Sequence, residues 1–342
     1  MEETDQQLFY EVGCCRLGKE TADGRRLPDA GGDGLVFVSS VGDSLRSAVA
    51  VVCDGISEEA GSGDKAVRDY VGILRKQSMP WLAFLALSQE ERRKPRAEQN
   101  ASTFVGLDLP HEAYRPVRVI VAGDSGCARW SEGEFRILTK KHTVWQEILE
   151  LDYPKDNKVS FCTLDEVGAG VFSDVEVNVF IKGLELAYAS NYFTSLRRRA
   201  VSFWDENMRE DGGEELSNRL LLDIMVSRCR HTVTVDIAST ERRLNEVNSP
   251  RESFFELKVG DIWMLFSDGM DVGQERIEEL LRSGLSPVML AKLLAEESSG
   301  NDDVAVVVVK VLDKPSKQEI VDPCFNSIQP DAEKDSTVAM DS

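Results

Sequence analysis

Aspartates mark the ends of the most strand-like segments in this chain. Three short runs of apolar, β-favouring residues lead into Asp54, Asp124 and Asp268, and the longest β-branched run begins directly after Asp302 and Asp303. Apolar runs of this length that stop at turn-forming residues are typical of buried strands. In an antiparallel sheet, the end of one strand lies beside the start of its neighbour. The pattern therefore predicts a β-rich fold in which these acids converge on one edge.

Converging carboxylates need a positive charge, because like charges a few ångströms apart cannot all stay ionised. Carboxylate, carbonyl and water oxygens are the ligands that Mg²⁺ and Mn²⁺ prefer. The three histidines, His111, His142 and His231, are not spaced with another histidine or a cysteine for zinc. The acids therefore predict a hard divalent cation, although any one Asp-Gly pair is explained more simply by a turn.

Strand and helix patterns follow one another along the chain without an internal repeat. Apolar residues at helical spacing predict helices over residues 63–77, 275–284 and 287–298, and strand-like runs occur in groups between them. This grouping predicts an α+β layered fold. The region that fits the plan least well, residues 140–230, contains two long helix-like segments and is predicted to be a helical insertion.

Six motifs together resemble one family. In chain order they are "GDG" at Asp33, "VVCDGI" at Asp54, "ASTFVGLDL" from Ala101, "VIVAGDSG" at Asp124, "MLFSDGM" at Asp268 and "GNDDVAVVVV" at Asp302. Their order and spacing resemble those of the metal-dependent Ser/Thr protein phosphatases of the PPM family, also called the type 2C class. The similarity covers residues 10–312, is faint between 140 and 230, and is that of a divergent member.

The resemblance implies a fold and an activity. The fold would be two packed antiparallel β-sheets flanked by helices, an α-β-β-α sandwich with a helical insertion. The activity would be hydrolysis of phosphoserine and phosphothreonine in proteins with two Mn²⁺ or Mg²⁺ ions. In such two-metal chemistry, the ions share a water, lower its pKa and hold the phosphoryl oxygens for in-line attack. A hydroxide that bridges the ions would attack directly, so no phosphoenzyme would form.

The resemblance also assigns roles to individual residues. Asp54 would bridge both ions, the carbonyl of Gly55 would bind one of them, and Asp268 and Asp302 would complete the other. Asp33 would act through metal-bound water. A weaker third ion would lie between Asp124 and Asp268. The residues expected to carry catalysis are Asp54, Asp268 and Asp302, and those expected at the metals are Asp33, Asp54, Gly55, Asp124, Asp268 and Asp302.

Several positions depart from the family pattern. Gly32 stands where a glutamate is common, and Asp29 is an alternative to Asp33 as the first acid. Ile56 cannot serve as the general acid that some members take from a histidine there. The family's phosphate-gripping arginine lies five residues before the first acid, where this chain has a proline. Arg25 and Arg26 are the nearest candidates for binding phosphate bidentately.

Two other classes of function stay open at this stage. The altered first motif and the divergent insertion favour a catalytically silent phosphatase-like module that binds and regulates a partner protein. Retention of carboxylates at the main positions argues against that alternative. The second alternative is a metal-binding regulatory or structural protein of another fold. A regulatory partner could contact the insertion, where Arg197, Arg198 and Arg199 form a basic run, although such runs are typical of solvated helix faces.

Charge excludes some partners. The formal net charge is -20, and residues 313–342 contribute -4 of it through seven acids and three lysines, so most of the charge belongs to the folded part. A strongly negative chain opposes nucleic acids and anionic membranes. A phosphoprotein substrate is the expected partner instead. Residues 1–9 are expected to be an N-terminal extension, and residues 313–342 a disordered acidic tail.

Compartment follows from what the sequence contains. No apolar run approaches the length of a membrane span, and the N-terminus is acidic and lacks the pattern of a secretory signal. The seven cysteines are expected to be reduced thiols rather than a disulfide framework. We therefore expect a cytoplasmic protein. A nuclear location is the alternative, because "RRKPR" at residues 92–96 has the composition of a nuclear signal.

Overall fold

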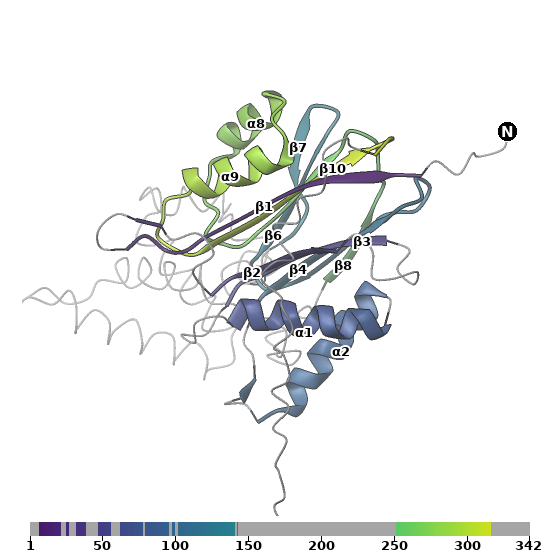
Figure 1. Ribbon diagram of the computed structural model, residues 1–342, viewed down its shortest axis with the longest axis vertical. Coiled ribbons are helices and arrows are strands. Elements are labelled where there is room, and N and C mark those ends of the chain that lie inside the picture. The colour runs from purple at the N-terminus through teal and green to yellow at the C-terminus, as the bar shows by residue number, and fades with distance from the viewer. Residues whose placement is uncertain are drawn as a thin grey trace, which may run out of the picture.

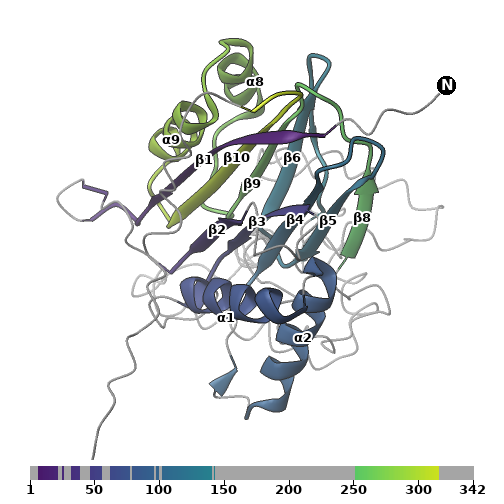
Figure 2. The same cartoon turned by 45° about the vertical axis from the view of Figure 1, so that its right-hand side comes forward.

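The computed structural model describes residues 7–21, 25–26, 32–38, 47–55, 62–77, 79–95, 98–99, 102–140, 142 and 251–315. Its strands form two antiparallel sheets of five strands each, stacked face to face (Figures 1 and 2). The expected residues Asp29 and Ile56, most of the expected insertion and all but the first residues of the expected acidic tail lie outside the described residues.

The two sheets combine segments from both ends of the chain. The first sheet has the order β1-β10-β9-β6-β7 and the second has the order β2-β3-β4-β5-β8. The strands of the first sheet are β1 (Phe9–Leu17), β10 (Val304–Leu312), β9 (Ile262–Phe266), β6 (Gly126–Ser131) and β7 (Glu134–Ile137). Those of the second are β2 (Gly34–Val38), β3 (Ser47–Cys53), β4 (Phe104–Pro110), β5 (Val117–Ala122) and β8 (Arg251–Phe255).

The run of valines in β10 is explained by its place in the first sheet. β10 pairs with β1 on one side and with β9 on the other. Ala305 and Val307 face the second sheet, whereas Val306 and Val308 face helices on the outside. Successive strand residues point to opposite faces, so a strand that is covered on both faces needs no polar alternation.

Among the described residues, two pairs of helices cover the outer faces of the sandwich (Figures 1 and 2). α1 (Ser62–Gln77) and α2 (Pro80–Arg93) pack on the second sheet, and α8 (Gln274–Arg282) and α9 (Pro287–Glu297) pack on the first. These layers confirm the expected α-β-β-α fold class. α2 is a helix that the sequence pattern did not predict, and its last turn includes Arg92 and Arg93, the first two residues of the basic run.

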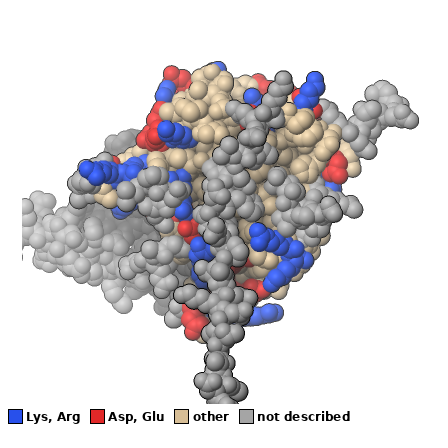
Figure 3. Space-filling model, viewed as in Figure 1, with Lys and Arg blue, Asp and Glu red and all other residues tan. Residues whose placement is uncertain are grey.

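Charge on the described surface is mixed rather than segregated. Basic and acidic side chains are interspersed over the described part of the face shown in Figure 3. Charged side chains of the described residues form ion pairs, such as Arg276 with Glu297 and Lys258 with Glu132. Among the described residues, no helix has both the length and the apolar character needed to cross a bilayer.

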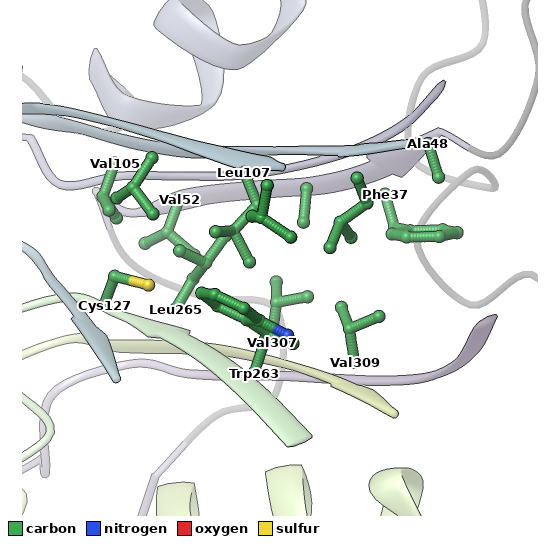
Figure 4. Packing of buried hydrophobic residues seen from close by; sticks show 14 of the residues in the cluster. Phe37, Ala48, Val52, Val105, Leu107, Cys127, Trp263, Leu265, Val307 and Val309 are labelled. Carbon is green, nitrogen blue, oxygen red and sulfur yellow. The ribbon is translucent and has the colours of Figure 1, made fainter. Parts of the chain in front are cut away.

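The inner core fills the space between the sheets (Figure 4). Trp263 and Leu265 of β9 and Val307 of β10 face Val52 of β3 and Leu107 of β4, and all five are buried. Complete burial of a side chain of this kind stabilises a fold by about 1.5 to 3 kcal/mol. The core therefore holds the two sheets at a fixed separation, and this fixes the ends of strands from both sheets relative to one another.

The cysteines differ in part from expectation. Cys15, Cys53 and Cys127 are free thiols, and the last two are buried. Cys14 of β1 is disulfide-bonded, so the expectation that all seven cysteines are reduced is wrong at this position.

Candidate metal centre

Three aspartates meet where strands of both sheets end. Asp54 follows β3, Asp124 follows β5 and Asp268 follows β9. Each offers one carboxylate oxygen to a group whose atoms all lie within 4.8 Å of one another. The structure thus brings together acids that are far apart in the sequence, at one end of the sandwich. A turn role alone would not require their carboxylates to face each other.

Asp33 belongs to the same cluster. It precedes β2, whose first residue, Gly34, pairs with Cys53 next to Asp54. Its buried carboxyl interacts with Asp54 and with the Ser267 hydroxyl, and its Oδ2 has no hydrogen-bond partner among the described residues. Burial, together with the charges of Asp303 and Asp268, raises the pKa of Asp33 to about 7.

Asp54 is the most strongly perturbed acid of the cluster. Burial, together with repulsion by the neighbouring Asp33, Asp268 and Asp124, raises its pKa to about 11. Four clustered carboxyls, one of which has an unpaired buried oxygen, fit a hard divalent cation, which would replace the protons that they otherwise hold. The chain could therefore hold Mn²⁺ or Mg²⁺ here.

The two acids before β10 have different surroundings. Asp303 accepts hydrogen bonds from the backbone N–H groups of Lys19 at 2.7 Å and Gly32 at 2.6 Å, one to each carboxylate oxygen. Asp302 is an exposed residue, but partial burial of its carboxyl and the charge of Asp268 raise its pKa. Both oxygens of Asp303 are thus used to hold the loop of Asp33, whereas Asp302 is coupled to the acid cluster.

Buried hydroxyls fix the loops that carry the acids. Thr103 accepts a hydrogen bond from Asp54 N–H at 3.1 Å and donates its own N–H to the Asp54 carbonyl at 2.8 Å. Ser267 donates its N–H to the Ala305 carbonyl at 3.0 Å and accepts from Ala305 N–H at 2.9 Å. Gly55 forms an isolated bridge with Ser102. These contacts limit how far each carboxylate can move.

The candidate phosphate-binding arginines lie in different places. Arg25 is exposed. Arg26 donates to the carbonyls of Gly18 at 3.0 Å, Ala295 at 3.0 Å, Ser298 at 3.2 Å and Asp302 at 3.2 Å. These bonds tie the chain after β1 to the segment before β10. Its guanidinium is therefore used largely within the fold.

Arg16, which the sequence analysis missed, lies beside the acids. Its guanidinium donates to the backbone carbonyl of Asp33 at 2.8 Å and to the carboxylate of Asp64 in the first turn of α1. Its side chain is 10% exposed. Counting back from Asp33 cannot find it, because the long segment between β1 and β2 separates the two residues. No spacing in the sequence marks Arg16, because its place beside the acids depends on the pairing of β1 with β10.

Comparison with solved structures shows which proteins share this fold. PppA of Pseudomonas aeruginosa, described as a key regulatory component of T6SS, matches with a TM-score of 0.53 at 14% identity, over 89% of this chain and 98% of PppA. The Streptococcus agalactiae serine/threonine phosphatase has a TM-score of 0.53 at 13% identity, over 88% and 99% of the two chains. Serine/threonine phosphatase Stp1 of Staphylococcus aureus has a TM-score of 0.51 at 14% identity, over 91% and 98%.

These similarities establish the fold. The chain has the two-sheet architecture of the bacterial Ser/Thr phosphatases, as the motif resemblance predicts. No family model matches its sequence, and no curated protein matches it either.

Metal binding should stabilise the protein more at higher pH. The raised pKa values of Asp33 and Asp54 mean that the metal-free folded state holds protons that the unfolded chain releases. The stability of the metal-free protein therefore falls as pH rises from about 4 through the folded-state pKa values. A cation removes this penalty, so the rise in melting temperature caused by Mn²⁺ is expected to be larger at about pH 8 than at about pH 5.5. Thermal denaturation at both pH values measures this, and equal rises would contradict it.

Proposed function

We propose that this chain is a metal-dependent protein phosphatase of the PPM family, which hydrolyses phosphoserine and phosphothreonine with two Mn²⁺ or Mg²⁺ ions. The observation that carries the proposal is the group of three carboxylates within 4.8 Å at the meeting point of the two sheets. The fold shared with Ser/Thr phosphatases supports it. The substrate would be a phosphoprotein, and the place of action the cytoplasm or nucleus.

The acids would hold the ions, each according to its place in the fold. Asp54 would help to hold both ions, and the carbonyl of Gly55 would bind one of them. Asp268 and Asp302 would complete the other site, and Asp33 would act through metal-bound water. Asp124 with Asp268 would hold a weaker third ion. When bound, such ions act as Lewis acids toward phosphoryl oxygens and lower the pKa of coordinated water.

The acid cluster itself makes phosphate binding depend on cations. A phosphate monoester carries close to two negative charges near neutral pH. The cluster would repel such a group, because every one of its ionisable side chains is a carboxyl. Substrate affinity and turnover should therefore both be lost together when the metal is removed.

Phosphate release from a phosphopeptide tests the proposal directly. Phosphoserine and phosphothreonine peptides would be incubated with the protein in Mn²⁺, in Mg²⁺ and in EDTA. We expect release with either cation and none with EDTA. Release that continues in EDTA, or that is equally fast without the protein, contradicts the proposal.

A catalytically silent module that regulates a partner is the second candidate. Gly32 at a position where the resemblance implies an acid favours it. The description of PppA as a regulatory component also shows that a protein with this fold acts in regulation. The insertion over residues 140–230 would then be the surface for a partner. Mn²⁺ binding without phosphate release from either peptide would favour this candidate.

Asp302 and Asp303 should behave differently on substitution. Asp302→Ala is expected to lower kcat/KM by about a hundredfold or more with little effect on stability, because a metal ligand supplies charge rather than packing. Asp303→Ala is expected to cost about 2 kcal/mol of stability, because two backbone N–H groups lose a charged partner. Activity assays and thermal denaturation of both variants measure this. Activity lost in Asp303→Ala but kept in Asp302→Ala reverses the assignment.

Three arginine variants test which arginine binds the phosphate. Arg16 would bind it, because its guanidinium lies beside the acids at Asp33. Arg16→Ala is therefore expected to lower kcat/KM tenfold to a hundredfold, because a hydrogen bond to a charged group contributes about 1.5 to 3 kcal/mol. Arg26→Ala should lower the melting temperature, because four carbonyls lose a donor. The kcat/KM of each of the three variants on one phosphopeptide shows which arginine binds the phosphate. A loss confined to Arg25→Ala or Arg26→Ala, with Arg16→Ala unchanged, would support the sequence-based prediction instead.

A further inference from the structure

We infer that Thr103 and Ser125 are positioning residues that set the separation of Asp54 and Asp124. His142 supports them through its hydrogen bonds to Gly123. The inference rests on the proposed function only in taking these two acids as metal ligands. Thr103, Ser125 and His142 lie in three different loops, and no sequence motif includes more than one of them. All three are buried, with exposed fractions of 0% for Thr103 and Ser125 and 2% for His142.

The topology leaves a gap that Thr103 spans. Asp54 follows β3 and Asp124 follows β5, and these two strands are not neighbours, because β4 lies between them. Strands two places apart are separated by about 9.5 Å, which is twice the spacing of hydrogen-bonded neighbours. The two acid-bearing loops therefore cannot be joined by the strand ladder. Thr103 directly precedes β4, so it lies between them.

On one side, Thr103 holds Asp54 by its backbone. The Thr103 N–H donates to the Asp54 carbonyl at 2.8 Å, and the Asp54 N–H donates to the Thr103 hydroxyl at 3.1 Å. This closed pair fixes the backbone on both sides of the Asp54 side chain. The same hydroxyl makes a short hydrogen bond with the hydroxyl of Ser125, the residue after Asp124. One threonine oxygen thus contacts both acid-bearing loops.

His142 secures the second loop from its other side. The backbone N–H of His142 donates to the Gly123 carbonyl at 2.8 Å, and its ring Nδ1 accepts from the Gly123 N–H at 3.0 Å. Gly123 has a φ of +109°, and a Cβ there would lie 2.5 Å from the Cβ of Thr103. Gly123 is therefore held between Thr103 and His142, directly before Asp124.

This arrangement supplies what a cation site needs from the protein. Free carboxylates would move apart by repulsion, and Mg²⁺ in particular demands close to ideal ligand geometry. Residues behind the ligands commonly change metal affinity or activity by about 10- to 100-fold when they are lost. The hydrogen bond between the Thr103 and Ser125 hydroxyls joins the two acid-bearing loops, and so it opposes the repulsion between Asp54 and Asp124.

The test compares Thr103→Val, which keeps the shape and removes the hydroxyl, with Thr103→Ser, which keeps the hydroxyl. Ser125→Ala removes the other half of the pair and serves if Thr103→Val does not fold. Ser88→Ala is the matched control, because Ser88 is equally buried and its hydroxyl accepts a hydrogen bond from Arg92 on α2. Mn²⁺ affinity is measured by calorimetry, alongside melting temperature and the separate kcat and KM values.

We expect Thr103→Val and Ser125→Ala to weaken Mn²⁺ binding by about tenfold or more, with kcat falling more than KM changes. Thr103→Ser should stay within about threefold of the parent, and Ser88→Ala should bind Mn²⁺ like the parent even where its melting temperature falls. The Thr103→Val/Ser125→Ala double variant should be little worse than Thr103→Val alone, because Thr103→Val already removes the hydroxyl–hydroxyl bond as well as the bond from Asp54 N–H.

Mn²⁺ affinity within about twofold of the parent in folded Thr103→Val or Ser125→Ala overturns the inference, and so does a parent that binds no Mn²⁺. A parent that binds Mn²⁺ but releases no phosphate contradicts the proposed function alone, because the affinity comparison can still be made.

Discussion

Asp54→Asn is expected to reduce Mn²⁺-dependent phosphate release by about a thousandfold or more in kcat/KM, equivalent to about 4 kcal/mol of transition-state stabilisation. Asn matches Asp in shape but lacks the charge, so the fold should be kept. Asp54 is the acid that all the others crowd, since its pKa is raised by Asp33, Asp268 and Asp124 as well as by burial. It is therefore the residue whose charge a cation would neutralise most directly.

The same substitution should have the opposite effect on the metal-free protein. Removal of one carboxyl from a crowded cluster relieves repulsion, so the melting temperature in EDTA should equal or exceed that of the parent near neutral pH. The stabilisation by Mn²⁺ should be largely lost. Loss of activity together with unchanged or higher metal-free stability distinguishes a ligand from a residue needed for folding.

A matched control is available on β4. Asp108 is another largely covered aspartate with a raised pKa, caused mainly by burial, and it lies near Ser47 and Arg118 rather than in the cluster. Asp108→Asn should leave Mn²⁺-dependent turnover close to that of the parent. If Asp54→Asn retains more than about a tenth of parent turnover at saturating Mn²⁺, the assignment of this cluster as the reaction centre is wrong.

The sequence anticipated the parts of the structure that depend on local pattern. Strand-ending acids at Asp54, Asp124 and Asp268 and the doubly buried run of β10 were readable, because burial and turn chemistry act over a few residues. α2 was missed because its apolar residues run almost all round the helix from Trp81 to Leu87, so that it has little of the periodicity that marks an amphipathic helix.

Features that depend on pairing between distant segments could not be predicted. Arg16 reaches Asp33 only because β1 pairs with β10 and ends beside the acids. Asp303 holds Lys19 and Gly32, which lie 284 and 271 residues away in the chain. The motif resemblance assigned a metal role to its neighbour Asp302 but gave no role to Asp303 itself. Side-chain roles of this kind depend on the strand register, and the register is set only when the whole sheet forms.

Gly63→Ala is the second substitution with a large expected effect, and it acts on stability first. Gly63 lies in the first turn of α1 and donates its N–H to the Gly32 carbonyl at 2.8 Å. A Cβ at Gly63 would lie 2.5 Å from the carbonyl oxygens of both Cys53 and Gly32. Backbone atoms cannot turn aside as a flexible side chain can, so α1 must move away from the sheet or the strand ends must shift.

The backbone that would shift carries two of the acids. Gly32 directly precedes Asp33, and Cys53 directly precedes Asp54. We therefore expect Gly63→Ala to lower stability by about 3 kcal/mol, the upper part of the range for overpacking, which corresponds to a fall of about 6 to 12 °C in melting temperature for a domain of this size. Mn²⁺ affinity should fall with it, because the loops of Asp33 and Asp54 are displaced.

Gly72→Ala in the same helix is the control for the intrinsic effect of the residue change. Gly72 is exposed, and a Cβ there would meet nothing within 4 Å. Alanine is favoured over glycine inside a helix by about 0.8 to 1 kcal/mol, so this variant should be more stable than the parent and should bind Mn²⁺ equally well. A lower melting temperature for Gly63→Ala together with a higher one for Gly72→Ala would therefore indicate the contact of Gly63 with the strand ends. If both variants shift the melting temperature in the same direction, the close approach of α1 to the acid-bearing loops does not control this fold.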